Sequence, residues 1–482
     1  MTGQFAYKFK KPVNFGFLDF STLDKRRFFC EEELRLNKRL APELYLEIVN
    51  ITGSPDKPVL NGEGHTIEYA VKMVQFPQSA QLDHVLSKGL LTNSHVDLIA
   101  KEVADFHAVC QAAHRDAHFG SADAVRSPVV ENFAQIRQQS VDQEDLDVLE
   151  EIERWSDESF SRHQADFQKR KVDGFIRECH GDMHLRNIAL IDKRIVIFDC
   201  LEFNEEFRWI DVMSEIAFLC MDLDDRSKAQ FSNRLLNAYL ELTGDYEGVI
   251  LLRFYQVYRA MVRAKVDALR LSQAGLSKDD RVDICADFRA YLHLARKYTQ
   301  PGKPMLFITH GLSGSGKTTG TQNLIEATGM IRIRSDIERK RLYSVAVTSR
   351  EEVIGKGIYS REASIKTYEH LSKLAESLLL AGRSVIVDAT FLKQHERKKF
   401  MALAQKVNVP FHILSFQTPE SVLRARVIER QAKKQDASDA GVAVLENQLK
   451  NNDPLTARET ECSTIIDNKP INVDDIRNLW LV

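Results

Sequence analysis

One stretch decides the fold of the second half of this sequence: Gly311-Leu312-Ser313-Gly314-Ser315-Gly316-Lys317-Thr318-Thr319. It fits the pattern G-x-x-x-x-G-K-[ST], in which glycines let backbone N–H groups turn inward around phosphates. A strand-like apolar segment, Met305–Thr309, precedes it, and a helical segment follows. The first turn of that helix points the positive end of its dipole at the same phosphates. The stretch therefore predicts a nucleotide-binding loop between a strand and a helix.

Two side chains of this loop carry the expected chemistry. Lys317 is placed to reach the β- and γ-phosphate oxygens, and the Thr318 hydroxyl is a ligand type that Mg²⁺ accepts. The predicted cofactors are therefore ATP and Mg²⁺. The alternative is a small-residue turn that fits the pattern by chance, and the strand before it and the helix after it count against this alternative.

The residues around the loop alternate between short apolar, β-branched segments and longer helical stretches. Strands are expected at 305–309, 331–334, 384–388, 411–416 and 464–466. This alternation predicts an α/β fold in which helices cover both faces of a parallel sheet.

Two carboxylates follow strands of this predicted sheet. Asp388 ends the strand at 384–388, and ligands of open α/β sheets bind at the carboxyl ends of strands, so we expect it to hold Mg²⁺ through water. Asp336 follows the strand at 331–334 and opens the sequence Asp336-Ile337-Glu338-Arg339, which puts Asp336 and Arg339 on one side of a first helical turn. The plainer alternatives are a strand-end turn for Asp388 and a helix N-cap for Asp336.

Residues 305–345 resemble the polynucleotide-kinase and zeta-toxin branch of the P-loop kinases, whose loop is followed by a strand and Asp-x-x-Arg. In that branch the Asp activates the acceptor hydroxyl, and the Arg holds substrate or phosphate. The resemblance therefore implies catalytic roles for Asp336 and Arg339.

Three arginines on a helix predicted at 419–433 resemble the lid arginines of the same branch: Arg424, Arg426 and Arg430. Arg426 and Arg430 share a helix face at i,i+4 and are expected to neutralise the transferring phosphoryl group. A solvated basic helix face is an equally good interpretation.

A second constellation lies at 180–199. The segment His180-Gly181-Asp182-Met183-His184-Leu185-Arg186-Asn187 fits the kinase catalytic-loop spacing H-x-D-x-x-x-x-N. Asp192-Lys193 is a plausible hairpin turn, and it would bring Asn187 beside Asp199. We expect Asn187 and Asp199 to be Mg²⁺ ligands and Asp182 to be the base at the acceptor hydroxyl.

The loop has His-Gly-Asp where protein kinases have His-Arg-Asp. With this motif, residues 4–295 resemble the aminoglycoside-phosphotransferase and choline-kinase-like family. The resemblance implies a bilobal protein-kinase-like fold. In this resemblance Lys8 corresponds to the ATP-orienting lysine, and Lys10 and Lys11 are the alternative candidates for that role. Its helix partner is Glu33, the acid on the apolar face of the helix predicted at 24–40. Asp211 resembles the structural acid that braces the catalytic loop.

The resemblance has one departure. A complete N-lobe has two strands and a glycine-containing loop before the lysine strand, whereas this sequence begins a few residues before Lys8. Either the start of the sequence has been clipped or this domain lacks its phosphate cover, and we expect a truncated N-lobe.

Composition limits the remaining possibilities. The 482 residues carry 66 Lys+Arg and 69 Asp+Glu, for a net charge of −3, so nucleic acid is possible as a partner but is not indicated by charge. Seven scattered cysteines predict buried thiols in a reducing, cytoplasmic compartment. No apolar run approaches the roughly 18 residues of a membrane span. Oligomeric state is left open.

A linker is expected at Gln300-Pro301-Gly302-Lys303-Pro304, which divides the sequence into domains 1–300 and 305–482. The whole arrangement resembles bacterial two-domain proteins that join an aminoglycoside-phosphotransferase-like domain to a P-loop (AAA-type) ATP-binding domain. It predicts an ATP- and Mg²⁺-dependent phosphotransferase acting on a hydroxyl of a small-molecule or nucleotide-like acceptor. The alternative is a nucleotide-switched ATPase or regulatory protein with an N-terminal pseudokinase domain.

Hints about the acceptor conflict. Three acids, Asp222, Asp224 and Asp225, would suit ammonium groups of a cationic acceptor. Three arginines spaced along a helix, Arg259, Arg263 and Arg270, would suit an anionic one. Both sets also fit solvated helix faces.

Overall fold

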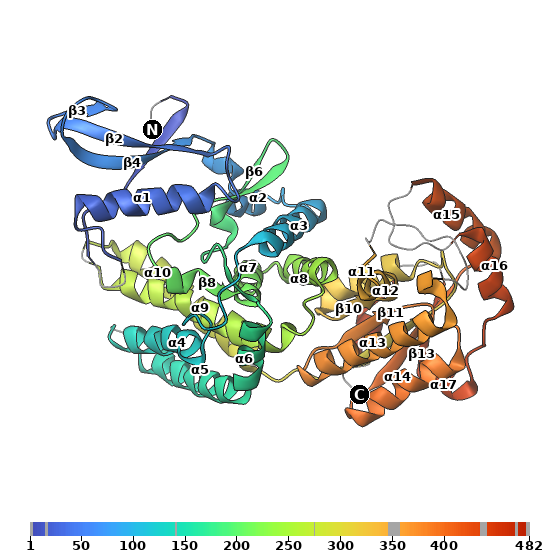
Figure 1. Cartoon of the computed structure of the whole chain (residues 1–482). Helices are drawn as coiled ribbons and strands as arrows, with labels where there is room; N and C mark the ends of the chain where they lie inside the picture. The colour runs from blue at the N-terminus through green and yellow to red at the C-terminus, as the bar shows by residue number, and fades with distance from the viewer. Residues whose placement is uncertain are drawn as a thin grey trace. The chain divides into compact units, whose positions relative to one another are not determined.

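The computed structural model describes residues 3–14, 18–139, 142–273, 275–345, 357–433, 441–467 and 471–478. The chain forms two compact units, one of Met1–Lys228 with Leu251–Thr299, the other of Ala229–Ile250 with Gln300–Val482 (Figure 1). The second unit resumes at Gln300, where the linker is expected. It also contains Ala229–Ile250, a segment that the sequence analysis places in the first domain.

The first unit opens with an antiparallel sheet of strands β1 (Phe5–Phe9), β2 (Tyr45–Ser54), β3 (Lys57–Leu60) and β4 (Thr66–Val74), in the order β1-β4-β2-β3. Helix α1 (Leu23–Asn37) packs against β2 and β4 and begins at Thr22, whose side chain caps it by accepting from Lys25 N. A buried cluster that includes Cys30, Tyr45, Val71 and Phe198 ties this sheet and helix to the chain around residue 198.

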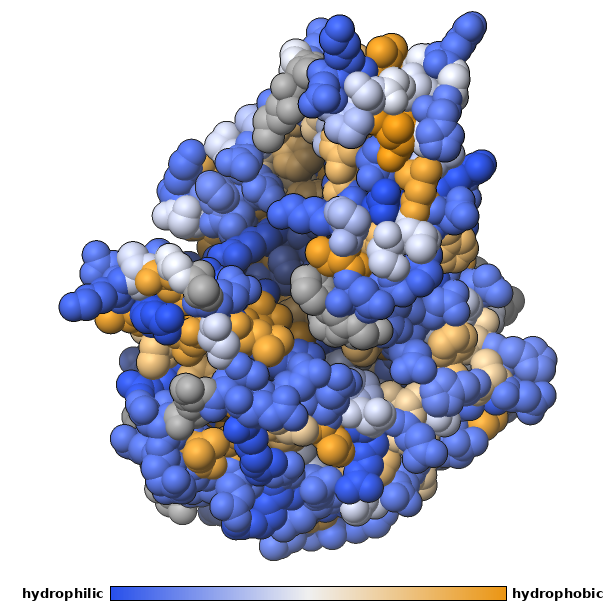
Figure 2. Space-filling model, turned by 90° about the vertical axis from the view of Figure 1, so that its left-hand side faces the viewer, coloured by the Kyte–Doolittle hydropathy of each residue, from blue (hydrophilic) through white to orange (hydrophobic). Residues whose placement is uncertain are grey.

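The rest of the first unit is mainly helical: α2 (Leu82–Ser87), α3 (Asn93–Val109), α4 (Ala122–Arg137), α5 (Gln143–Arg162), α6 (Gln164–Val172), α7 (Val212–Asp225), α9 (Val249–Leu271) and α10 (Lys278–Thr299). Helix α7 is buried from Val212 to Leu223, and this buried stretch includes the polar residues Ser214, Glu215 and Asp222. A small sheet above a helical lobe is the predicted bilobal kinase-like fold. The face drawn in Figure 2 is mostly hydrophilic, with small separate hydrophobic groups.

Two short antiparallel pairs complete this unit: β5 (Ile176–Glu178) with β8 (Trp209–Asp211), and β6 (Ile188–Ile191) with β7 (Arg194–Ile197). Asp192 and Lys193 join β6 to β7 with φ values of 48° and 64°. Positive φ at both central residues is typical of a type I′ hairpin turn. The predicted hairpin is confirmed.

The second unit contains strands β9 (Leu306–His310), β10 (Ile331–Arg334), β11 (Val385–Asp388), β12 (Phe411–Gln417) and β13 (Ser463–Asp467), in the order β10-β11-β9-β12-β13. All four neighbouring pairs are parallel, so the predicted parallel sheet is confirmed. Its helices after β9 are α11 (Lys317–Thr328), α12 (Ser335–Leu342), α13 (Arg361–Leu380), α14 (Gln394–Lys406), α15 (Glu420–Lys433), α16 (Val442–Lys450), α17 (Ala457–Glu461) and α18 (Val473–Asn478).

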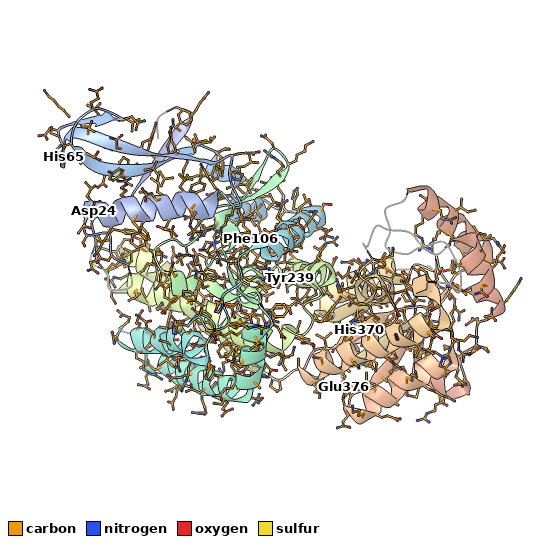
Figure 3. The ribbon with its side chains drawn as sticks, in the orientation of Figure 1. Asp24, His65, Phe106, Tyr239, His370 and Glu376 are labelled. Atoms are coloured by element: carbon orange, nitrogen blue, oxygen red, sulfur yellow. The ribbon has the colours of Figure 1, made fainter. Side chains whose placement is uncertain are left out.

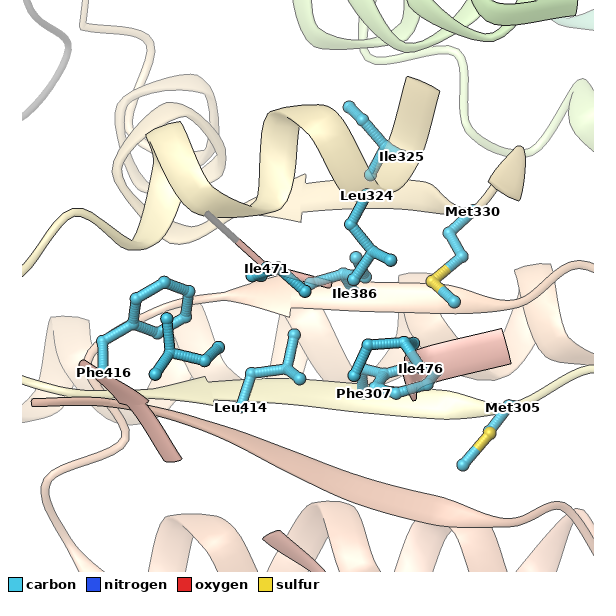
Figure 4. Packing of buried hydrophobic residues seen from close by; sticks show 11 residues of the cluster. Met305, Phe307, Leu324, Ile325, Met330, Ile386, Leu414, Phe416, Ile471 and Ile476 are labelled. Atoms are coloured by element: carbon cyan, nitrogen blue, oxygen red, sulfur yellow. The ribbon is translucent and has the colours of Figure 1, made fainter. Parts of the chain in front are cut away.

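Helix α11 packs on one face of this sheet through a buried cluster. Leu324 and Ile325 of the helix join Phe307 of β9, Ile386 of β11 and Leu414 of β12 in this cluster (Figure 4). This packing fixes the helix that begins at the glycine-rich loop, and thereby the loop itself.

Helix α8 (Ala229–Thr243) packs against α11 and β10. Asn237 donates to Met330 O at 3.0 Å and accepts from Arg332 N at 2.8 Å, so its amide pairs with the backbone at the start of β10. Tyr239, which is buried on α8, is labelled in Figure 3. The contacts of α8 therefore make it part of the fold of the second unit.

All seven cysteines are free, and five of them are buried. Among the helices that the structure describes, none is both long and apolar enough to cross a membrane.

Candidate active sites

The glycine-rich loop lies at the carboxyl end of β9 and leads directly into α11, as predicted. Gly314 and Gly316 have φ values of 83° and 87°, in the left-handed region that favours glycine. A Cβ on Gly311 would lie 2.7 Å from the carbonyl oxygen of Phe416. These glycines therefore let the backbone turn tightly beside β12.

Lys317 is held by the backbone of its own loop. Its Nζ donates to Gly311 O at 2.9 Å and to Leu312 O at 2.8 Å. Burial lowers the pKa of Lys317 to about 8; Asp388 and Asp336 oppose this, and Arg430 adds to it. The predicted residues Asp336, Asp388 and Arg430 therefore all act electrostatically on Lys317.

The Thr318 hydroxyl donates to Asp388 Oδ2 at 2.7 Å. Asp388 is buried at the end of β11, where Thr309 Oγ1 lies 3.5 Å from its Oδ1. A hydroxyl and a carboxylate side by side at the phosphate loop are the donor set that Mg²⁺ takes alongside nucleotide oxygens. These two predicted ligands therefore fit the ion.

Asp336 lies in the first turn of α12, just past the carboxyl end of β10. The Arg339 guanidinium donates to Ile358 O at 2.8 Å and lies 5.1 Å from the ring centroid of Tyr359. A buried guanidinium needs acceptors, and a backbone carbonyl outside the helix supplies one here. Asp336 and Arg339 are three residues apart on α12 and so occupy one side of the helix, as expected, while the guanidinium of Arg339 donates to Ile358 O.

The three arginines of α15 separate into two groups. Arg426 donates to Gly314 O at 3.3 Å and thus contacts the phosphate loop. Arg430 is close enough to influence the pKa of Lys317. Arg424 instead forms ion pairs with Glu420 and Glu446 at 2.8 and 3.1 Å. Arg426 and Arg430 therefore lie near the loop, and the solvated-face interpretation holds for Arg424.

In the first unit, Lys8 forms ion pairs with Glu33 at 2.7 Å and Asp199 at 2.5 Å. Lys10 also contacts Glu33, together with Glu202. The Lys8 side chain is 40% exposed and that of Lys10 only 3%. Burial lowers the pKa of Lys8, but Glu33 and Asp199 outweigh it and leave the pKa well above its ordinary value. Lys8 is thus the accessible lysine of the two.

Asp182 and Asn187 contact each other in the catalytic loop. The Asn187 amide donates to Asp182 O at 2.9 Å and to Oδ2 at 3.1 Å. Burial raises the pKa of Asp182, but a hydrogen bond from His184 and the positive charges of His184, His180 and Arg259 hold it well below its usual range. Asp182 is therefore a carboxylate at neutral pH.

Asp199 has a left-handed backbone, with φ of 65°. A left-handed backbone is uncommon for a non-glycine residue, although Asp adopts it more readily than most. The hairpin brings Asn187 and Asp199 together through the backbone, since Phe198 N donates to Asn187 O at 2.9 Å. Their side chains nevertheless have different partners, Asp182 for Asn187 and Lys8 for Asp199.

Sequence reasoning missed Glu215, which braces the catalytic loop. This fully buried carboxylate accepts from Gly181 N at 2.7 Å and His180 N at 3.2 Å, and pairs with His107 at 2.9 Å. Possible ligand atoms of His107, Cys179 and Glu215 lie within 4.8 Å of one another. The existing partners of Glu215 indicate a structural brace. An acid inside the apolar stretch 212–223 was the available signal.

Asp211, the acid expected to brace this loop, has other partners. It pairs with Arg170 at 2.6 Å and caps α7 by accepting from Met213 N at 2.8 Å. Arg259 is buried and donates to Gly181 O at 3.0 Å, so both expectations for it, anion clamp and solvated face, are wrong. Glu215 and Arg259 thus hold the backbone of Gly181 from its N–H and its carbonyl.

Comparison with known proteins agrees with this division of sites. Residues 82–252 match a phosphotransferase enzyme family, and residues 306–455 match an AAA domain. The chain is 30% identical over 446 residues to the uncharacterized protein Rv2004c of Mycobacterium tuberculosis, covering 92% of this chain and 87% of the relative. The uncharacterized protein Mb2027c of Mycobacterium bovis matches with the same identity and coverage.

Solved structures match over a smaller part of the chain. A sugar kinase from Janibacter sp. is 20% identical, with a TM-score of 0.29, over 37% of this chain and 94% of that chain. A gluconokinase from Sinorhizobium meliloti 1021 is 18% identical, with a TM-score of 0.26, over 37% of this chain and 98% of that chain. At these scores we draw no functional argument from them.

Proposed function

This chain belongs to the same family as these mycobacterial proteins, and we propose that it is an ATP- and Mg²⁺-dependent phosphotransferase acting on a hydroxyl of a small-molecule or nucleotide-like acceptor. One observation carries the proposal: Thr318 and Asp388 form a 2.7 Å pair beside Lys317 at the phosphate loop. The match to a phosphotransferase family and to an AAA domain supports the same class of reaction.

At the second unit, Thr318 and Asp388 would hold Mg²⁺, which neutralises negative charge on the phosphate oxygens. The backbone N–H groups of residues 311–319 bind the phosphates. Lys317, Arg426 and Arg430 supply positive charge where the phosphoryl group transfers. Asp336 orients the acceptor hydroxyl and takes its proton, and Arg339 holds substrate or phosphate, as in the P-loop kinases that this segment resembles.

The first domain, residues 1–300, carries a second nucleotide site in this proposal. Lys8 and Glu33 orient the nucleotide, Asn187 and Asp199 are the metal ligands, and Asp182 is the base. We assign most ATP turnover to residues 305–482, because the loop there supplies phosphate-binding amides, a lysine and both metal ligands together. We place the protein in the cytoplasm.

One observation favours an ATPase switch with an N-terminal pseudokinase as the second candidate. Asp199 is already neutralised by Lys8, and the Asn187 amide is engaged by Asp182. A metal ion bound by the Asp199 carboxylate would have to compete with Lys8 for it, whereas the Asn187 contact uses Nδ2 and not the amide oxygen that binds metals.

The deciding experiment incubates the chain with γ-labelled ATP, Mg²⁺ and a panel of hydroxyl-bearing metabolites and nucleosides. Label appearing on an acceptor supports the phosphotransferase. Label released only as inorganic phosphate across the whole panel contradicts it and supports the switch. Lys317→Ala and Asp182→Asn, run in parallel, assign any transfer to one domain.

A further inference from the structure

The phosphate loop has a side-chain partner on a helix far along the chain. Ser313 N donates to Oε1 of Gln448, on α16, at 2.8 Å. The N–H groups of such a loop are the donors that bind phosphate oxygens. The amide carbonyl of Gln448 therefore occupies a donor that a nucleotide needs.

Apolar packing holds Gln448 in this position. Leu445, which is fully buried on α16, packs against Leu423 and Val427 of α15, and Leu312 of the loop joins the same cluster. Leu445 and Gln448 are three residues apart and share a helix face. One face of α16 therefore supplies both the apolar contact to the loop and the hydrogen bond to Ser313.

We propose that Gln448 is an internal competitor of the nucleotide: its Oε1 holds the Ser313 N–H, and a phosphate oxygen that binds there must displace it. The proposal rests on nucleotide binding at the loop, as proposed above. A hydrogen bond to a charged acceptor is stronger than one to a neutral amide. A phosphate oxygen therefore replaces Gln448 Oε1 at the Ser313 N–H. Displacement of Gln448 also removes one of the two contacts between α16 and the loop, so that helix α16 responds to nucleotide.

The test measures the dissociation constants of MgATP and of magnesium triphosphate for the full chain and its variants. Gln448→Leu and Gln448→Ala remove the competing amide oxygen. Both variants are expected to bind MgATP and magnesium triphosphate about 2- to 10-fold more tightly, because this factor corresponds to the net free energy of one neutral hydrogen bond. Gln448→Glu adds negative charge beside the phosphates and is expected to bind more weakly. Asn447→Ala, an exposed neighbour on α16, is the matched control and should bind like the parent.

A second readout separates competition from mere packing. In the parent, MgATP should increase hydrogen–deuterium exchange of backbone amides in 442–450, and in Gln448→Leu this increase should be absent. Unchanged or weaker MgATP binding by both Gln448→Leu and Gln448→Ala would overturn the inference. If Lys317→Ala also leaves every MgATP dissociation constant of the chain unchanged, the nucleotide site at the loop is wrong; if Lys317→Ala removes one of the binding events, only the role of Gln448 fails.

Discussion

The Thr318 hydroxyl donates a 2.7 Å hydrogen bond to Oδ2 of Asp388, although the two residues belong to segments far apart in sequence. Strands β9 and β11 are adjacent and parallel, with Ile308 opposite Val387. The loop that follows β9 and the last residue of β11 therefore meet at one edge of the sheet. Two side-chain oxygens converge there without any local sequence signal joining them.

Replacing Asp388 by Asn should raise the Mg²⁺ requirement of ATP turnover. Asn keeps the size and can still accept from Thr318, but it removes the negative charge that favours the ion. We expect turnover at low Mg²⁺ to fall by about 10²–10³ and to recover partly at high Mg²⁺. The measurement is ATP hydrolysis across a Mg²⁺ titration. Asp467→Asn, an exposed acid that ends β13 of the same sheet, is the control. If the Mg²⁺ dependence of ATP hydrolysis is the same for Asp388→Asn and the parent, Asp388 has only a structural role.

The affinity for MgATP should weaken as the pH rises above 8. Burial lowers the pKa of Lys317 to about 8. Bound phosphates stabilise the charged lysine and raise that pKa again, so the complex holds more protons than the free protein between pH 8 and the higher value. Binding is then insensitive to this group below pH 8 and weakens above it, by up to about tenfold per pH unit. Dissociation constants from pH 7 to 9.5 test this. Lys317→Arg, which stays charged, should give a flat profile; a flat profile for the parent would contradict the assignment.

Asp336→Asn should retain MgATP affinity and lose phosphoryl transfer to the acceptor. A positioned base contributes about 10²–10⁴ in rate, and the amide cannot take the proton. Equilibrium binding of MgATP and single-turnover transfer from γ-labelled ATP separate the two effects. Full transfer by the Asn variant would leave Asp336 as no more than a polar residue in the first turn of α12.

Patterns of local sequence predicted much of this molecule. The loop at 311–319, the parallel strands on either side of it and the hairpin turn at Asp192-Lys193 each depend on residues next to one another in sequence. Their backbone requirements, such as positive φ at the turn, are local as well. Such features can be read before any tertiary contact is known.

Tertiary partners could not be read in the same way. Arg339 is three residues from Asp336, yet its guanidinium contacts Ile358. Two lysines, Lys8 and Lys10, share Glu33 but differ in their burial and in their second partner, Asp199 for Lys8 and Glu202 for Lys10. Residues 229–250 continue the first domain in sequence, but their partners lie on β10 and α11. Each outcome depends on which distant group satisfies a buried charge or amide.

Removing Glu241 of α8 should destabilise the second unit. Its carboxylate pairs with buried Arg332 at 2.8 Å, and Arg332 in turn donates to Thr318 O at 3.0 Å. Glu241→Ala leaves this guanidinium buried without its anionic partner, at a cost of about 3 kcal/mol. Thermal and urea unfolding of the full chain measure the loss.

The control for Glu241 is an exposed ion pair of the same unit. Glu376, labelled in Figure 3 on α13, pairs with Lys406 at 2.5 Å, and the lysine side chain is 67% exposed. Glu376→Ala should cost under about 1 kcal/mol, because solvent screens such pairs. If Glu241→Ala and Glu376→Ala lower the free energy of unfolding equally, the buried Arg332 pair contributes no more to stability than an exposed ion pair.

The two candidate sites can be ranked by one pair of variants. Lys317→Ala removes a preorganised positive charge from a loop that also offers phosphate-binding amides, Thr318 and Asp388, so we expect ATP turnover to fall by about 10²–10³. Asp182 belongs to a site where Lys8 already neutralises Asp199, so Asp182→Ala should leave most turnover intact when no acceptor is present. Steady-state ATP hydrolysis at saturating Mg²⁺ compares both variants with the parent. Circular dichroism spectra that match the parent ensure that neither variant is simply unfolded. If Asp182→Ala is the inactive protein and Lys317→Ala the active one, the first domain performs the turnover and this ranking is reversed.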